Sequence, residues 1–293
     1  MCIMMIVTDC AADLLPEEVA ELGVEVAPLF IQFPEGEVAS GDLTPDEFYN
    51  RLEAMQPYIP TTSQPSPEIF GGIYRRLAET HARFSEPPEI LSIHISSGLS
   101  GTLNSARVGA VQAKEAVVHL FDSLTLSGGQ RFQVLAAARA MRAGWRMDAI
   151  LERLRELRQQ TEVIYTLDTL EYLRRGGRIG RVQALAGALL HLKPVIRVDP
   201  ADGKYSTAGK ERTIRKSLES IADSLAKKYA DQAVWASVLH GRFAGQADVL
   251  AELLRQRLNL AQLEILRISP VLGVHTGPGI VGAAVTPMEL MEF

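Results

Sequence analysis

Hydroxyl side chains and glycines gather in one segment of the sequence, residues 96–102, directly after an apolar run. Within it, Gly98-Leu99-Ser100-Gly101-Thr102 nearly matches the G-x-S-x-G elbow of serine hydrolases, but Thr102 stands where the strained turn needs a small residue. A helical pattern follows, and backbone N–H groups at a helix start bind anions, with serine hydroxyls assisting. The segment is therefore either a carboxylate site built around Ser100 or a serine-rich helix cap.

A second hydroxyl cluster and one histidine could complete such a site. Residues 61–66 read Thr-Thr-Ser-Gln-Pro-Ser, and His275 lies in a glycine-rich segment. A serine and a histidine together could also hydrolyse an ester, with Ser100 as the nucleophile and His275 as the base. Taken alone, residues 61–66 equally suit a loop that ends in a helix cap at Ser66. His94 lies in a strand pattern, which favours a hydrogen-bonded core histidine.

Three arginines surround a glycine pair in Leu-Arg-Arg-Gly-Gly-Arg-Ile, residues 173–179. Arginine is favoured in phosphate contacts and protein interfaces, so the segment could dock an anion or a partner protein. It could equally be a solvated loop. The glycine pair favours a flexible element, and we expect Arg178 to be exposed.

Other motifs point away from nucleotide and metal chemistry. Residues 277–282 fit the dinucleotide pattern G-x-G-x-x-G, but neither the helix nor the acidic residue that the motif requires follows them. A tight turn into a closing strand is the better interpretation. The sequence has no G-x-x-x-x-G-K-[ST] loop, so we expect no intrinsic nucleotide binding. Cys2 and Cys10 have neither metal nor redox spacing, which predicts no metal site and fits a reducing cytosol.

Length and composition are those of a globular protein of about two domains. The chain has 293 residues, 47% hydrophobic and 22% charged, and can bury enough surface to hold an internal ligand. Its 30 basic and 35 acidic residues give a net charge of −5, without the basic excess of nucleic-acid-binding proteins. The longest uncharged apolar stretch, 182–192, is shorter than the roughly 18 residues of a membrane span. With no basic signal-peptide region at the start, we expect a cytoplasmic location and no membrane insertion.

The first half of the chain alternates strand and helix patterns. Extended segments are predicted at 3–7, 24–33, 90–95 and 117–121, with helices that start near Pro16, Thr44 and Ser66. Thr44-Pro45-Asp46-Glu47 forms a capping box. One helical pattern then runs from Phe132 to about Gln159. This alternation predicts an α/β fold with a mostly parallel sheet.

After residue 160 the pattern changes to neighbouring strands. Strands are predicted at 163–167, 195–198, 204–206, 234–239, 264–268 and 280–285, with helices at 214–225 and 249–258. The turn signal Asp-Pro-Ala-Asp-Gly at 199–203 joins two of the strands as a hairpin. We therefore expect a second α/β domain with a mixed or antiparallel sheet, and domains at 1–159 and 160–293.

Four of these motifs, in this order, resemble the DegV family of fatty-acid-binding proteins. They are the hydroxyl segments 61–66 and 95–102, the arginine segment 173–179 and His275-Thr276-Gly277-Pro278-Gly279. Thr8-Asp9 and Lys193-Pro194-Val195 fit as well, so the resemblance spans almost the whole chain. It implies a two-domain α/β fold that holds one long-chain fatty acid in an enclosed tunnel between the domains.

The resemblance also implies residues for the ligand and for a partner. The implied carboxylate ligands, followed by secondary candidates, are Thr62, Ser100 and His275, then Ser63, Ser97 and Gly101. Arg178 matches an arginine associated with a kinase partner, and Arg212 aligns with another basic position near the mouth of the site. Cys10 departs from the family, which usually has serine after Thr-Asp.

In the best-understood DegV members, the protein is the acyl-carrier subunit of a bacterial fatty acid kinase. A separate ATP-binding subunit phosphorylates the bound carboxylate to an acyl phosphate that feeds phospholipid synthesis, so the resemblance implies a binding protein without its own catalytic site or cofactor. Burying a 16-carbon chain contributes on the order of 10 kcal/mol, at about 0.8 kcal/mol per CH₂. The buried carboxylate must then be hydrogen-bonded. The alternatives are a serine hydrolase that uses Ser100 and His275, and a docking module without lipid.

Overall fold

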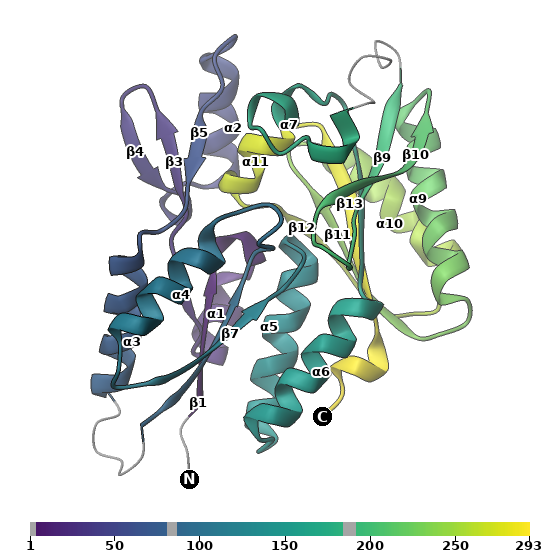
Figure 1. Ribbon diagram of the computed structural model, residues 1–293. Helices are drawn as coiled ribbons and strands as arrows, with labels where there is room; N and C mark the ends of the chain where they lie inside the picture. The colour runs from purple at the N-terminus through teal and green to yellow at the C-terminus, as the bar shows by residue number, and fades with distance from the viewer. Residues whose placement is uncertain (1–3, 81–86, 184–191) are drawn as a thin grey trace.

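The computed structural model describes residues 4–80, 87–183 and 192–293 of the chain. Within these residues the fold has three β-sheets with helices packed around them (Figure 1). No helix of this part of the chain is long and apolar enough to cross a membrane. Cys2, Ile3 of the first predicted strand and most of the apolar stretch 182–192 lie outside the described residues.

The first sheet has four parallel strands in the order β2-β1-β6-β7, which confirms the parallel sheet predicted for the first half. The strands are β1 (Met4–Asp9), β2 (Glu25–Ala27), β6 (Glu89–His94) and β7 (Val117–Asp122). The helices of this part are η1 (Cys10–Ala12), α1 (Pro16–Leu22), α3 (Pro67–Thr80) and α4 (Thr102–Gln112). Phe70 and Tyr74 of α3 pack with Ile90 of β6 in one apolar cluster, so α3 covers part of one face of the sheet.

A small antiparallel sheet, β4-β3-β5, lies beside the first. Its elements are β3 (Phe30–Phe33), β4 (Gly36–Ala39), η2 (Ser40–Asp42), α2 (Pro45–Ala54) and β5 (Thr61–Ser63). The extended segment predicted at 24–33 is divided between two sheets, and Pro28 lies at the break, where its missing N–H cannot join a ladder. The capping box is confirmed, since the Thr44 N–H donates to Glu47 Oε2 at 2.9 Å and the Glu47 N–H donates to Thr44 Oγ1 at 3.2 Å.

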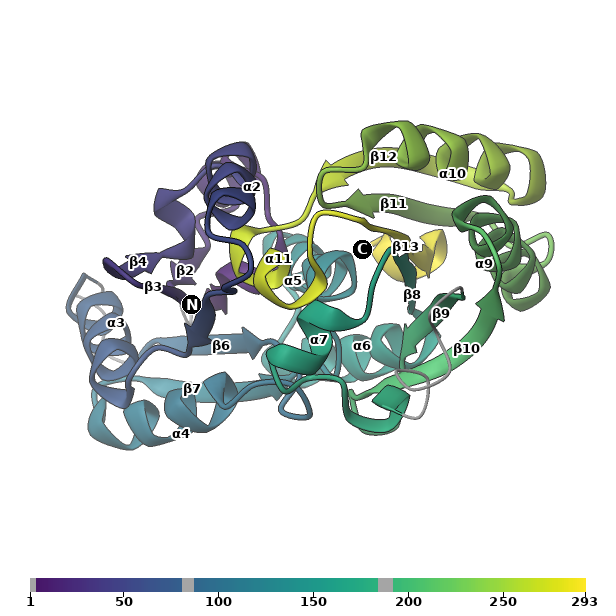
Figure 2. The ribbon, with the colours of Figure 1, turned by 90° about the horizontal axis from the view of Figure 1, so that it is seen from above.

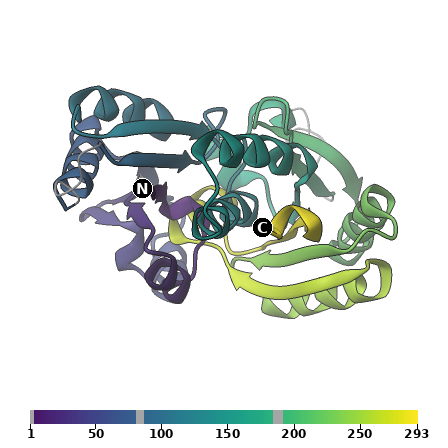
Figure 3. The ribbon, with the colours of Figure 1, turned by 90° about the horizontal axis from the view of Figure 1, so that it is seen from below.

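Two helices replace the single helical run expected from Phe132 to Gln159. They are α5 (Ser127–Arg142) and α6 (Met147–Gln160). The chain turns between them at Gly144, whose φ of +81° is a left-handed conformation that glycine adopts at little cost. Helix α5 is buried along almost its whole length and contacts both β1 and the central strand of the third sheet. It therefore lies between the two halves of the molecule (Figure 3).

The third sheet has six strands in the order β10-β9-β8-β13-β11-β12. They are β8 (Glu162–Leu167), β9 (Lys193–Val198), β10 (Tyr205–Glu211), β11 (Val234–His240), β12 (Leu260–Arg267) and β13 (Ile280–Pro287). Only β11 and β12 run parallel, which confirms the predicted mixed sheet and the hairpin of β9 and β10. Val281, Ala283 and Val285 face α9 (Ile214–Tyr229) and α10 (Ala244–Arg257), whereas Ala284 faces α5.

The second half also contains short helices. They are α7 (Glu171–Arg175), η3 (Gly180–Val182), α11 (Pro270–Thr276) and η4 (Met288–Met291). Although α11 belongs to the second half in sequence, it contacts α2, β3, β5 and η1 of the first half. Figure 2 shows it between α2 and α7. The strands of the first two sheets all precede residue 160 and those of the third all follow it. The domain limits 1–159 and 160–293 stay a prediction.

Candidate functional site

Residues from distant segments surround a small cavity of about 40 Å³, which we call the polar cavity. It is lined by Ala11, Leu29, Thr62, Ile95, Leu99, Ser100, Arg178, Tyr205, Val271, Leu272 and His275. The three residues predicted as primary carboxylate ligands therefore meet in one place. They come from β5, from the loop between β6 and α4, and from α11. Their role as ligands stays a prediction.

His275 lies in the last turn of α11, not in a glycine-rich loop as its sequence neighbours suggested. Its Nε2 atom is 2.8 Å from Thr62 Oγ1. Burial, with a smaller contribution from the charge of Arg178, lowers the pKa of His275 from 6.5 to about 4. The imidazole is therefore neutral at neutral pH.

The backbone of Gly176 touches the imidazole of His275. A Cβ atom at Gly176 would lie 2.2 Å from His275 Nδ1. A residue with a side chain at this position would push the ring away from Thr62. The first glycine of the Arg-Arg-Gly-Gly-Arg segment is thus explained by close packing of the end of α7 on α11, which the sequence alone does not reveal.

Ser100 satisfies both interpretations of its loop. Its Oγ accepts from the Thr102 N–H at 3.3 Å and lies 2.8 Å from Thr102 Oγ1, so it helps to cap α4. It also lines the polar cavity. A hydroxyl held at a helix start in this way can donate its proton to an anion while the helix dipole favours the negative charge.

The secondary candidates are not among the lining residues of the polar cavity. Ser63 donates to Glu37 at 3.2 Å on the outer side of β5. Ser97 uses both its N–H and its hydroxyl on the carboxylate of Asp122, at 3.1 and 2.5 Å. Gly101 is the residue that precedes α4. Ser97 in particular is already occupied by a charged partner.

Arg178 is partly buried, so the expectation that it is exposed is wrong. It donates to the carbonyl oxygens of Leu99 at 3.3 Å and Gly176 at 2.8 Å, which hold it in the wall of the polar cavity. Arg174 and Arg175 are exposed and pair with Glu171, as expected of a solvated loop. Arg212 is exposed just after β10.

Asp9 fixes two of the loops that line the polar cavity. Its carboxylate accepts from the Ala11 N–H at 3.1 Å and from the Ile95 N–H at 2.9 Å. The same carboxylate lies 2.9 Å from His94 Nδ1, and Ser92 Oγ lies 2.7 Å from His94 Nε2. Asp9, Ser92 and His94 are all fully buried, which confirms His94 as a hydrogen-bonded core residue.

The predicted hairpin turn at 199–203 reaches across to the serine loop. Ser96 Oγ donates to the carbonyl oxygen of Gly203 at 2.8 Å, and Arg178 of the second half reaches Leu99 of the first. These contacts close the seam between the halves beside the polar cavity. No local sequence signal links the two segments, which are 107 positions apart.

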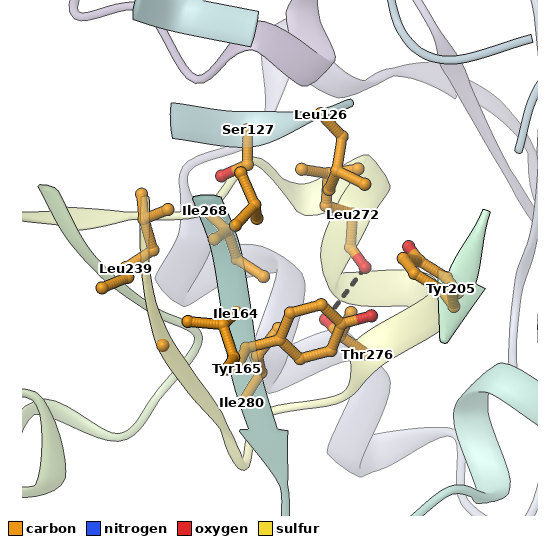
Figure 4. A pocket seen from close by; sticks show the side chains of 13 residues that line it. Leu126, Ser127, Ile164, Tyr165, Tyr205, Leu239, Ile268, Leu272, Thr276 and Ile280 are labelled. Atoms are coloured by element: carbon orange, nitrogen blue, oxygen red, sulfur yellow. Dashed lines mark hydrogen bonds between the residues drawn. The ribbon is translucent and has the colours of Figure 1, made fainter. Parts of the chain in front are cut away.

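A second, almost wholly apolar cavity continues inward from the first, and we call it the inner cavity (Figure 4). It encloses about 20 Å³, and its lining includes Leu126, Ser127, Val163, Tyr165, Leu239, Ile268 and Ile280. Tyr205 and Leu272 line both cavities, so the two are neighbours. Burial raises the pKa of Tyr205 to about 12, so its phenol stays neutral. A polar end thus leads into an apolar one.

Comparison with known proteins shows the family. A family model described as "Uncharacterised protein, DegV family" matches residues 4–288. The chain belongs to the DegV family. A DegV domain-containing protein of Deinococcus radiodurans is 36% identical over 96% of this chain and 95% of its own length. One from Clostridium perfringens is 34% identical over 96% of this chain and 97% of its own.

Solved structures of fatty-acid-binding proteins have the same fold. The fatty-acid-binding DegV family protein of Thermus thermophilus superimposes with a TM-score of 0.89 at 32% identity, over 97% of this chain and 99% of that one. A stearic-acid-binding protein of Eubacterium ventriosum gives a TM-score of 0.88 at 27% identity, over 97% and 98% of the two chains. The two α/β halves seen here are thus those of the DegV fold.

The geometry of the DegV site does not support the serine hydrolase alternative. A serine nucleophile needs a hydrogen bond to its base, and the base needs a third group to orient it. Here His275 Nε2 pairs with Thr62, while Ser100 pairs with Thr102. Among the residues that the structure describes, no partner reaches His275 Nδ1.

Cys10 has a packing role. Its Sγ accepts from the Leu29 N–H at 3.3 Å, as a hydroxyl could. Burial raises the pKa of its thiol to about 12, so it is a poor nucleophile. Among the described residues, no group of three or more His, Cys, Asp or Glu side chains could hold a metal ion.

Proposed function

We propose that this DegV protein binds a long-chain fatty acid, with its carboxylate in the polar cavity and its acyl chain in the inner cavity. The observation that carries this is the shared wall of Tyr205 and Leu272 between a polar and an apolar cavity. The fatty-acid-binding DegV structures that share the fold support it. The cavities enclose about 40 and 20 Å³, space for only a few waters, so the walls must move apart to admit the chain.

Hydrogen bonds to the carboxylate come from groups that do not neutralise it fully. Neutral His275 donates its one N–H to Thr62 Oγ1, 2.8 Å away, which leaves the Thr62 hydroxyl proton free for the carboxylate. Ser100 donates a second hydroxyl proton to the same carboxylate. Arg178, in the same wall, supplies a nearby positive charge. A carboxylate held in this way keeps its nucleophilic oxygen and lies beside the seam closed by the Ser96–Gly203 contact.

The proposal includes a partner. A separate ATP-binding fatty acid kinase subunit would phosphorylate the bound carboxylate to an acyl phosphate, in the cytoplasm, for use in phospholipid synthesis. The lack of a P-loop motif in this sequence supports a partner as the source of the nucleotide site. Arg178, in the cavity wall, and exposed Arg212 are the candidate docking residues.

Native mass spectrometry of the purified chain, followed by lipid extraction, tests the binding function. We expect one fatty acid per chain. After the lipid is removed, palmitate should rebind, whereas hexadecanol, which has the same tail without the charge, should bind more weakly. A stripped chain that is folded and binds no fatty acid of 14 to 18 carbons would leave only the docking-module alternative.

Replacing Ser100 by alanine should weaken fatty-acid binding about 10- to 150-fold, because a hydrogen bond to a charged group contributes roughly 1.5–3 kcal/mol. Ser97→Ala is the matched control, since its hydroxyl serves Asp122 outside the cavity, and it should change the affinity less than twofold. A fluorescent fatty-acid titration measures both. Equal losses, or a larger loss in Ser97→Ala, would show that the wrong serine has been assigned.

Alanine substitutions of the two arginines assigned to docking, Arg178 and Arg212, should have different effects on fatty-acid binding and on phosphorylation. Because Arg178 lines the polar cavity, Arg178→Ala should weaken fatty-acid binding about tenfold or more and slow acyl-phosphate formation. Arg212→Ala should leave affinity unchanged and slow only the kinase reaction, more strongly at low salt, because rim charges act on association rate. Normal phosphorylation of Arg212→Ala at every salt concentration would place the docking surface elsewhere.

A further inference from the structure

A large open groove shares Ile268 with the inner cavity, and we call it the outer groove. Its volume is about 770 Å³, within the range of small-molecule sites. Apolar side chains of both halves form most of its lining, among them Leu14, Leu15, Val19, Leu43, Ile265 and Leu266. None of the residues that line the polar cavity lines this groove.

One layer of residues separates the outer groove from the inner cavity. Ile268, which is only 3% exposed, lines both. Beside it, Ser127 of the inner cavity donates a hydrogen bond to Asp13 of the groove, and the Ser269 N–H donates to the same carboxylate at 2.8 Å. In Figure 4, Ile268 and Ser127 lie on the side of the cavity away from Tyr205, which borders the polar cavity.

The order of the three spaces gives the direction of an acyl chain. A carboxylate in the polar cavity places the first carbons at Tyr205 and Leu272, and the following carbons must run through the inner cavity toward Ile268. The inner cavity has little room of its own. Beyond Ile268 lies a groove whose apolar wall could cover further CH₂ groups.

We propose that Ile268 is the residue that sets the acyl chain length, and that the outer groove receives the distal carbons of chains that pass it. This role of Ile268 rests on the proposed function, because it concerns the length of the acyl chain of the bound fatty acid. Polar Asp13 and Arg267 also border the groove. Because most of the groove wall is apolar, it suits the methyl end of an ordinary fatty acid, and the ligand needs no second carboxylate at that end.

The test compares saturated fatty acids of 14 to 22 carbons in competition titrations on the lipid-stripped chain. Ile268→Ala should raise the affinity for the 20-carbon acid relative to the 16-carbon acid at least tenfold, since each additional buried CH₂ is worth about fourfold. Leu239→Ala is the matched control, because it removes a similar volume from the inner cavity without touching the groove. It should lengthen the preferred chain less and lose affinity again at 22 carbons.

A second variant keeps the proposal testable if Ile268→Ala does not fold. Ile265 lines the groove but not the inner cavity and is 39% exposed, so Ile265→Trp should fold and fill part of the groove. We expect it to weaken binding of the 20-carbon acid at least fivefold and to leave the 14-carbon acid unchanged. In a double variant it should reverse the gain of Ile268→Ala.

Two results would overturn the role of Ile268 and the groove. One is a folded Ile268→Ala protein with the chain-length profile of the wild type or of Leu239→Ala. The other is an Ile265→Trp protein whose affinity is unchanged, or changed equally, at every chain length. If the wild-type chain binds no fatty acid at all, the proposed function itself fails, so the two failures are distinguishable.

Discussion

Replacing Arg131 with methionine should lower the free energy of unfolding by about 3–5 kcal/mol, because it removes the cation to which two carboxylates near the core are hydrogen-bonded. Arg131 is 1% exposed on α5. Its Nε donates to Glu18 of α1 at 2.9 Å, and its Nη2 donates to Glu264 of β12 at 3.2 Å. The guanidinium therefore joins the two halves of the molecule through the helix between them. Urea unfolding followed by circular dichroism measures the loss.

Two comparisons separate this interaction from a general effect of losing an arginine. Arg142→Met removes an exposed pair with Glu21, whose side chain is 72% exposed, and should cost no more than about 1 kcal/mol. In the triple variant Arg131→Met, Glu18→Gln, Glu264→Gln, no uncompensated charge is left, and most of the stability should return. A small loss in Arg131→Met alone would mean that the carboxylates regain water and that the pair does not brace the halves.

Local patterns predicted most of the elements, because the physics that forms them is local. The capping box at Thr44 and the turn signal at 199–203 act within a few residues, and both are present. Apolar periodicity does not reveal the break between α5 and α6, which depends on the positive φ of Gly144 and the extended backbone of Arg146. The partners of Arg131 lie 113 and 133 positions away, beyond the reach of any window.

The candidate site was predicted less from pattern than from resemblance. The sequence around Ser100 is compatible with either a helix cap or an anion site. The structure shows that this one hydroxyl both caps a helix and lines a cavity. Thr62 and His275 are 213 positions apart, so only the fold could bring them together. The burial of Arg178 and the wall at Ile268 depend on how the halves pack, which one sequence does not encode in any short segment.

Lowering the pH should destabilise the protein through His275 by about 3 kcal/mol between pH 6.5 and pH 4. The pKa of His275 is about 4 in the folded chain, because of burial and then the charge of Arg178, against 6.5 ordinarily. Between these values the unfolded chain binds a proton that the folded chain does not, so stability falls as pH falls. Each unit of difference corresponds to about 1.4 kcal/mol.

The wild-type curve alone will not show this slope, because Asp13 opposes it. Burial raises the pKa of Asp13 from 3.8 to about 6. Between these pH values the folded chain binds a proton on Asp13 that the unfolded chain does not, so the contribution of Asp13 to the free energy of unfolding rises as pH falls. The measurement is therefore the difference in unfolding free energy between wild type and His275→Gln, which leaves Asp13 in both proteins. That difference should decline by about 3 kcal/mol from pH 6.5 to pH 4, and less when a fatty acid is bound, because a carboxylate beside the imidazole favours its charged form. A difference that stays constant across the window would mean that the imidazole is hydrated and titrates as it does in the unfolded chain.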